Sequence, residues 1–193
     1  MRTGMKSNSL NLISKILAVL CLLWTGVQPV YGEREVYVAP PYVVPPPPKS
    51  TVFLVDHGDG TLSTPKYNRM WAKKDSYADL GRCLNLYEAK DYVEKLTAGG
   101  YDDWRLPGLG ELAMIYDNTK ENVMGWDHNP EFPLALDERF ADGAAYWYWS
   151  LDINKTELDE CCARTFYFVN GFPHIRRFSS CENGGVRAVR NTN

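Results

Sequence analysis

The sequence predicts one domain that mixes helices with strands, and three observations lead to this class. Segments 85–97 and 110–118 carry apolar residues at helical spacing. Between residues 145 and 190, short runs rich in aromatic and β-branched residues are separated by turn-forming residues, which is typical of strands. The chain has 193 residues, enough for one packed core with appended segments.

The first 32 residues have the features of a secretory signal peptide. Arg2, Lys6 and Lys15 are followed by the apolar run 16–24, and Gly32 suits the cleavage position. The alternative is a transmembrane anchor, but this apolar run is well short of the roughly 20 residues that span a bilayer. We therefore expect an exported protein, periplasmic or at the cell surface, that is not inserted in the membrane after cleavage.

Residues 33–50 are rich in proline and are predicted to form an extended tether. Consecutive prolines favour polyproline II geometry, which rises by about 3 Å per residue. The alternative is a ligand for an aromatic groove in a partner protein. The folded domain is then expected to occupy residues 51–193.

The charge of the chain argues against nucleic acid as a partner. The leader contains three positive and no negative residues, so its removal changes the formal net charge from −3 to −6. An acidic protein binds polyanions poorly unless its basic residues cluster. The densest basic group is Arg176, Arg177, Arg187 and Arg190. Because strand alternation puts Arg176 and Arg177 on opposite faces, we expect weak or no binding to heparin.

The N-terminal part of the domain is expected to begin with a hairpin. Residues 51–55 and 61–63 favour strands, and 56–60 supplies the turn between them. The aspartates of this turn resemble a calcium loop, but the downstream acidic ligand is missing, so we interpret the turn as structural. Residues 70–71 are expected to form a short buried strand.

A corner between the two predicted helices has the clearest local pattern in the chain. The glycine pair at 99–100 ends the first helix, and Glu111 opens the second. Between them, Trp104 is expected to be buried and Arg105 to be hydrogen-bonded. We interpret this corner as structural rather than as a ligand site.

The C-terminal half alternates strands with irregular segments. Segments 118–142 and 152–160 show no sustained period, and long irregular loops often carry function. Asp127 and His128, in the first of these loops, are candidate polar groups, although solvated surface is the commoner role of such a pair. The expected strands are 145–151, 163–169, 174–178 and the closing run 185–190.

Four cysteines follow the leader, and an even number in an exported chain favours two disulfides. A zinc site is the alternative, but the paired spacing of zinc ligands is absent. If 170–173 is the loop of a hairpin, Cys162 lies opposite Cys181, within disulfide reach. This register predicts the bond Cys162–Cys181, and Cys161, which points to the other face of its strand, would then pair as Cys83–Cys161. A bond between the neighbours Cys161 and Cys162 is the least favoured option. We expect no metal site.

The order of these landmarks resembles the Lcl C-terminal domain family of bacterial exported proteins. The resemblance rests most on the run 103–107 with Glu111 and on the Tyr-Trp-Ser run at 148–150. It implies an α+β fold similar to C-type lectins and to the formylglycine-generating enzyme, with two helices on a small mixed, mainly antiparallel sheet and long loops. The residues that we assign to the structural signature are Asp103, Trp104, Arg105, Leu106, Pro107, Glu111 and Trp149.

The sequence and the resemblance together favour an exported, non-catalytic module that binds a glycan or a protein at the cell envelope. The candidate binding residues are Trp126, His128, Tyr148, Arg177 and Arg187. One alternative is a structural envelope protein without a small ligand. Another is an enzyme on the formylglycine-generating scaffold, which needs reactive cysteines, whereas the four cysteines here are assigned to disulfides. We expect no cofactor.

Overall fold

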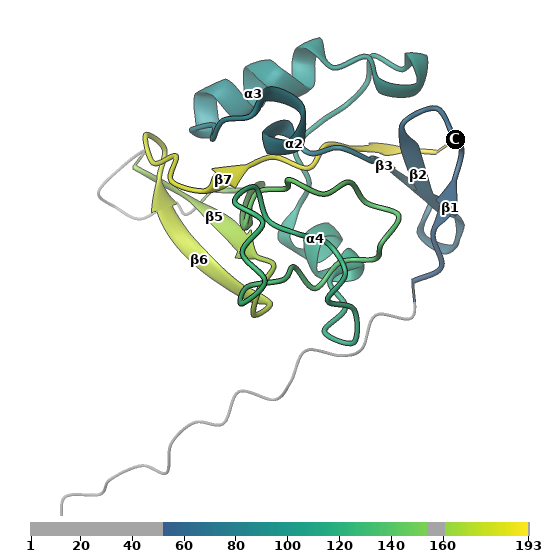
Figure 1. The fold of residues 1–193 in the computed structure, drawn as a ribbon. Helices are drawn as coiled ribbons and strands as arrows, with labels where there is room; N and C mark the ends of the chain where they lie inside the picture. Colours follow the sequence, from purple (N-terminus) through teal and green to yellow (C-terminus); the bar gives the residue numbers. More distant parts are fainter. Residues whose placement is uncertain (1–51, 154–160, 193) are drawn as a thin grey trace, which may run out of the picture. The chain divides into compact units, whose positions relative to one another are not determined.

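Two four-stranded sheets form the framework of the domain (Figure 1). The computed structural model describes residues 52–153 and 161–192, so the predicted leader and tether lie outside the described residues. The first sheet has the order β1 (Val55–Asp56), β2 (Thr61–Thr64), β3 (Arg69–Ala72) and β8 (Val189–Asn191). The second has the order β6 (Phe172–Arg177), β5 (Cys162–Tyr167), β4 (Trp147–Ile153) and β7 (Gly184–Gly185). Neighbouring strands are antiparallel, except that β4 and β7 run parallel.

Three α-helices lie in the described part of the chain: α2 (Ser76–Leu80), α3 (Leu86–Lys95) and α4 (Leu109–Ile115). Two short 3₁₀ turns, η1 (Pro65–Tyr67) and η2 (Ala98–Gly100), complete the helical elements. The structure therefore confirms the α+β class and both predicted helices. The five-residue helix α2 was not expected, because it is too short to show a helical period.

The beginning of α3 shows why a helix forms there. The side chain of Asn85 accepts a hydrogen bond from the backbone N–H of Glu88, and the Glu88 carboxylate accepts one from the N–H of Asn85. This reciprocal pair satisfies backbone donors that the first turn leaves free. The buried face of α3 then carries Leu86, Ala89 and Val93.

The predicted closing strand is in fact two short strands in different sheets. β7 belongs to the second sheet and β8 to the first, and the buried residues 186–188 connect them. In Figure 1 this yellow segment runs from one sheet to the other across the domain. The C-terminal segment thus links the two halves of the fold.

The buried link carries an arginine that the sequence analysis placed in a binding site. Arg187 is fully buried and donates hydrogen bonds from Nη1 to the carbonyls of Ala72 and Lys73, and from Nη2 to the Tyr148 hydroxyl at 2.8 Å. Nη2 also lies 3.6 Å from a carboxylate oxygen of the buried Asp75. The prediction that Tyr148 and Arg187 contact a ligand is therefore wrong, since both side chains hold the core together.

The corner between α3 and α4 is confirmed as structural. Trp104 is 4% exposed, and its Nε1 donates to the carbonyl of Ala98 at 3.2 Å. Arg105 donates two hydrogen bonds to the Glu111 carboxylate, at 2.8 and 2.7 Å. Both interactions fix the loop against the domain. The other signature residues also have structural contacts. Asp103 pairs with Arg190, Leu106 and Pro107 are buried, and Trp149 is fully buried.

Glu111 should make the domain sensitive to acid. Burial alone would raise the pKa of Glu111, but hydrogen bonds from Arg105, the Gly108 N–H and Arg69 outweigh it and lower the pKa to about 2. A carboxylate with a lowered pKa stabilises the folded state above its unfolded pKa of about 4.5, and this stability is lost as the pH falls towards 2. We therefore expect the thermal midpoint to drop as the pH falls from 4.5 to about 2, the range between the two pKa values. Glu111→Gln should flatten this part of the curve in a thermal melt, and an unchanged acid slope would contradict the assignment.

The hairpin of β5 and β6 has a different register from the predicted one. Tyr167 pairs with Phe172 and Cys162 pairs with Arg177, so the turn is 168–171 rather than 170–173. The predicted turn 170–173 includes Pro173, which cannot donate a hydrogen bond to a strand ladder, whereas the structure pairs Pro173 with Phe166. β6 is the outer strand of its sheet, however, and an edge strand accommodates proline.

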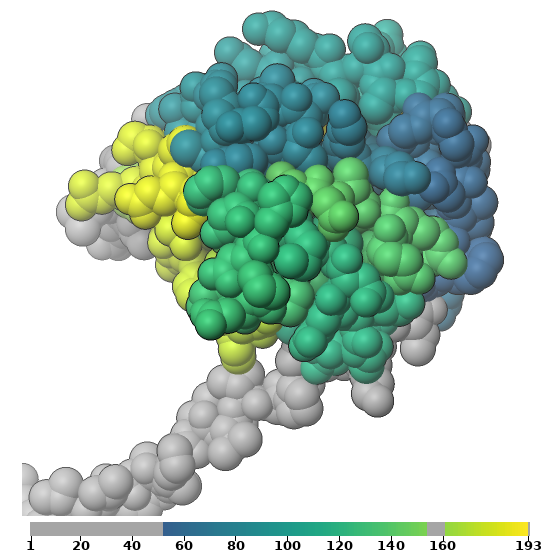
Figure 2. Space-filling view, in the orientation of Figure 1, coloured from purple at the N-terminus to yellow at the C-terminus, as the bar shows by residue number. Residues whose placement is uncertain are grey.

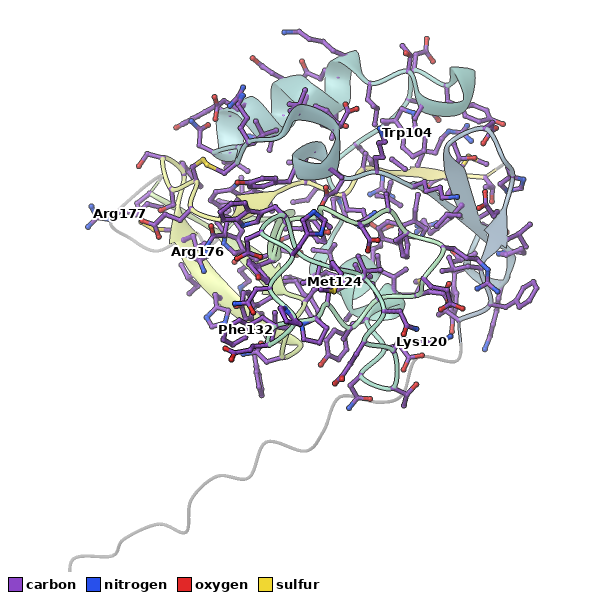
Figure 3. All side chains as sticks on the ribbon, in the orientation of Figure 1. Trp104, Lys120, Met124, Phe132, Arg176 and Arg177 are labelled. Carbon is purple, nitrogen blue, oxygen red and sulfur yellow. A yellow bond between two sulfur atoms is a disulfide. The ribbon has the colours of Figure 1, made fainter. Side chains whose placement is uncertain are left out.

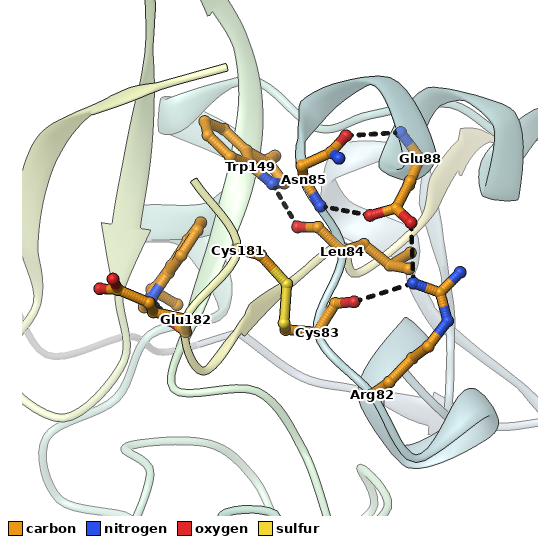
Figure 4. The surroundings of a disulfide bond; sticks show 9 residues. Arg82, Cys83, Leu84, Asn85, Glu88, Trp149, Cys181 and Glu182 are labelled. Atoms are coloured by element: carbon orange, nitrogen blue, oxygen red, sulfur yellow. Dashed lines mark hydrogen bonds and ion pairs between the residues drawn. A yellow bond between two sulfur atoms is a disulfide. The ribbon is translucent and has the colours of Figure 1, made fainter. Parts of the chain in front are cut away.

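This register removes both predicted disulfides. Cys181 lies beyond the end of β6 and bonds to Cys83, and the neighbours Cys161 and Cys162 bond to each other. The predicted pairs Cys162–Cys181 and Cys83–Cys161 are therefore wrong. Figure 4 shows the Cys83–Cys181 bond beside the buried indole of Trp149, at the entry to α3.

Candidate functional site

A hollow of about 260 Å³ opens on one face of the second sheet, and we call it the β6 hollow. It combines aromatic side chains with polar groups that can form hydrogen bonds. Its lining residues are Tyr146, Trp147, Tyr167, Asn170, His174, Arg176, Glu182 and Asn183. Binding sites for small molecules are commonly concave and aromatic, with a few convergent polar groups.

Strand pairing explains why the aromatic residues meet in this hollow. Trp147 on β4 lies opposite Tyr167 on β5, and His174 on β6 lies opposite Thr165. Because alternate residues of a strand share a face, Tyr167 and His174 point to the same side as Trp147. The Tyr167 and His174 rings are 6.0 Å apart at 89°, and the Tyr146 and Tyr167 rings are 6.3 Å apart at 40°.

Arg176 places a cation over the aromatic floor. Its guanidinium lies 4.3 Å from the centre of the Trp147 ring, a favourable cation–π distance. Its Nε is buried and has no hydrogen-bond partner. Burial lowers the pKa of Arg176, and nearby Glu182 partly opposes this change. Arg176 is thus a partly desolvated donor inside the hollow.

The segment after Cys181 forms the opposite wall. The carbonyl of Glu182 accepts a 2.7 Å hydrogen bond from the Trp147 indole, and the carbonyl of Asn183 accepts one from the Tyr146 backbone. Gly184 follows, and a Cβ at this position would lie 2.1 Å from the Trp147 ring. The Cys83–Cys181 bond and these contacts hold the wall in place without a ligand.

The long loop 118–142 contacts one lining residue of the hollow, Tyr146. Tyr146 donates a 2.6 Å hydrogen bond to Asp127, and burial together with this bond raises the pKa of Tyr146. The neighbouring Trp126 is 38% exposed and stacks on Tyr77, with ring centres 5.3 Å apart. This loop, green in Figure 2, covers much of the face shown there.

The structure separates the five residues that the sequence analysis grouped as a binding site. Trp126 and His128 are exposed on the loop beside the hollow, and Arg177 is exposed at the end of β6. Figure 3 labels Arg176 and Arg177 at the same edge of the molecule. Only Arg176 lines the hollow, as expected for neighbours on opposite faces of a strand. Tyr148 and Arg187 lie in the core.

The four arginines of the basic group do not form one patch. Arg176 is in the hollow, Arg177 is exposed, and Arg187 is buried. Arg190 pairs with Asp103 and lies 3.9 Å from the centre of the Tyr101 ring. This separation is consistent with the expectation of weak heparin binding.

The sequence analysis missed the aromatic floor and Arg176. One signal was available in the sequence, namely which strand residues share a face. The predicted and observed registers of the hairpin differ by an even number of residues, and an even shift does not change the face on which a residue lies. Both registers therefore put Tyr167, His174 and Arg176 on one face. The contributions of Tyr146, Trp147 and the wall could not be found this way, since they depend on contacts distant in sequence.

A larger groove of about 510 Å³ lies between α2 and α3, and four of its polar side chains pair with one another. Tyr92 donates to Asp79 across it at 3.2 Å, and Arg82 pairs with Glu88 at 2.9 Å. Burial, followed by the nearby Asp79, raises the pKa of Tyr92, so its hydroxyl remains a donor. The β6 hollow is the better candidate because it contains an unpartnered buried donor.

The described residues contain neither a metal-binding cluster nor a membrane-spanning helix. No cluster of three or more His, Cys, Asp or Glu side chains is placed to hold a metal ion there. None of the helices in 52–153 and 161–192 has the length and hydrophobicity of a membrane span.

Comparisons with known proteins identify the family of the chain. A search of curated proteins finds no significant match. The family model described as "Lcl C-terminal domain" matches residues 60–190, a range that includes the strands from β2 to β7, most of β8 and every residue of the β6 hollow. The chain therefore belongs to the Lcl C-terminal domain family.

Proposed function

We propose that this protein is an exported, non-catalytic module that binds a glycan in the β6 hollow. The apolar face of a sugar ring packs on aromatic rings, while its hydroxyls need hydrogen-bond partners at the edges. The hollow supplies both, since the partly exposed Tyr167 presents aromatic surface and Asn170, His174 and Asn183 surround it with polar groups. This pairing of aromatic floor and polar rim is the observation that carries the proposal.

The cysteine pairing supports a binding role outside the cytoplasm. All four described cysteines are in disulfides, which persist in oxidising compartments. A thiol-dependent enzyme would need one of these sulfurs as a thiolate. Export to the periplasm or cell surface, and the expected similarity to C-type lectins, are parts of this proposal.

Substitution of Tyr167 tests the site. We expect the purified chain to bind members of a glycan array, and Tyr167→Ala to weaken binding about tenfold, because one aromatic contact of about 1.4 kcal/mol is removed. Tyr167→Phe keeps the ring and should retain binding. The measurement is the dissociation constant for the strongest array sugar, by titration calorimetry.

Tyr87→Ala is the matched control, since Tyr87 is 60% exposed on α3 and does not line the hollow. It should bind as the unmodified chain does. If the array shows no binding, or if both alanine variants bind equally well, the proposal is wrong.

A further inference from the structure

Among the buried and partly buried arginines of the described residues, Arg176 differs from all the others. Each of those forms an ion pair with a carboxylate within 4 Å; they are Arg69, Arg105, Arg139, Arg187 and Arg190. Arg176 has no such pair among the described residues, although it is half-buried and its Nε is fully enclosed. A half-buried guanidinium without a carboxylate partner favours an anion supplied from outside, which would bind the terminal nitrogens because Nε is enclosed.

The chemistry of the guanidinium specifies the acceptor. Its planar edge forms paired N–H···O bonds with a carboxylate, and these charge-assisted bonds are stronger than bonds to a neutral hydroxyl. The Trp147 ring covers one face of Arg176, which leaves the edges of the group for hydrogen bonding. A carboxylate attached to a sugar ring would reach Arg176 while the ring packs on the neighbouring aromatic surface.

The surroundings limit the ligand to a low charge. Glu182 lines the same hollow and repels additional negative groups, and Arg177 lies on the other face of β6. The side chains that line the hollow thus include one guanidinium, that of Arg176, and one carboxylate, that of Glu182. A densely charged polyanion would gain one ion pair here and meet repulsion elsewhere.

From these observations we propose that the β6 hollow selects sugars that carry a single carboxylate, and that Arg176 binds this group. The inference rests on the proposed glycan binding and specifies the class of sugar. Two kinds of acidic sugar have the required chemistry, namely uronic acids and lactyl-substituted amino sugars.

Two matched pairs of sugars test the selectivity. Glucuronic acid differs from glucose by its carboxylate, and N-acetylmuramic acid differs from N-acetylglucosamine by its lactyl group. In titrations of the full chain at physiological salt, we expect the acid of at least one pair to bind about tenfold more tightly than its neutral partner, and the pair that shows this identifies the kind of acid. Tighter binding of heparin than of either acid would overturn the inference in favour of a polyanion site.

Arg176→Gln and Arg177→Gln form a matched pair of variants, because each removes one positive charge from adjacent positions of β6. Arg176→Gln should abolish the preference for the acid, and Arg177→Gln should retain it. A preference that survives in Arg176→Gln, or that is lost equally in both variants, overturns the inference.

The outcomes separate this inference from the proposed function. If acid and neutral sugars bind the unmodified chain equally well in the hollow, the charge selectivity is wrong and glycan binding stands. If none of the four sugars binds and no member of the glycan array binds either, the proposed function is wrong. The inferred selectivity, which depends on it, is then wrong as well.

Discussion

Replacing Cys83 and Cys181 together with alanine is expected to lower the free energy of unfolding by about 4–5 kcal/mol. The two residues are 98 positions apart, and in the chain-entropy model a loop of about 100 residues gives a stabilisation of this size. The bond also holds the wall of the β6 hollow through the residues that follow Cys181. In urea denaturation, the midpoint of the unfolding transition of this variant should fall strongly. At low urea the variant should still give most of the signal of the folded protein.

The neighbouring disulfide provides the control. Cys161 and Cys162 are adjacent, so their bond closes almost no loop, and the same model gives a stabilisation of about 1 kcal/mol. The variant with both replaced by alanine should therefore unfold near the midpoint of the unmodified chain. Peptide mapping that joined Cys162 to Cys181, or equal destabilisation by the two double variants, would contradict the assigned pairing.

Trp104→Ala is expected to destabilise the domain by about 3–5 kcal/mol, the usual range for removing a buried aromatic ring. Trp104 is 4% exposed, so its loss leaves a cavity, and the carbonyl of Ala98 loses its hydrogen bond. The free energy of unfolding from denaturant titration measures this effect.

Trp126→Ala removes the same side chain from a position that is 38% exposed. It should lower stability by about 1 kcal/mol, since it loses one stacking contact with Tyr77. If Trp104→Ala were as mild as Trp126→Ala, the corner between α3 and α4 would not be a structural element of the core.

Local chemistry made several parts of the fold predictable. The period of apolar residues identified α3 and α4, and the Trp-Arg-Leu-Pro run identified the corner, because their stabilising contacts come mainly from neighbours in sequence. Strand alternation correctly separated Arg176 from Arg177. In each case, a pattern within a few residues determines the outcome.

The errors arose where long-range packing decides. Tyr148 and Arg187 were predicted to bind a ligand, but the fold pairs Arg187 with Asp75 in the core. The hairpin register depended on whether Pro173 lies on an edge strand, which the sequence does not reveal. The disulfide error followed from the register.

The candidate site was predictable only in part, because some of its residues meet through strand alternation and others only through long-range pairing. Alternation places Tyr167, His174 and Arg176 on one face, whereas Tyr146 and Trp147 join them only through sheet pairing. The wall at 182–183 depends on a disulfide to the start of α3. A local pattern could therefore identify the residues that β5 and β6 contribute to the hollow. It could not identify the residues of β4 and of the wall at 182–183.

Amide chemical-shift mapping of the full chain with a bound sugar tests the central claim most directly, because it reports where the sugar lies. With the tighter-binding of glucuronic acid and N-acetylmuramic acid as the probe, the account predicts the largest shifts at Tyr167, His174 and Asn183, together with the side-chain Nε–H of Arg176. The same titration would contradict the account if the largest shifts fell on Asp79 and Tyr92 in the groove between α2 and α3.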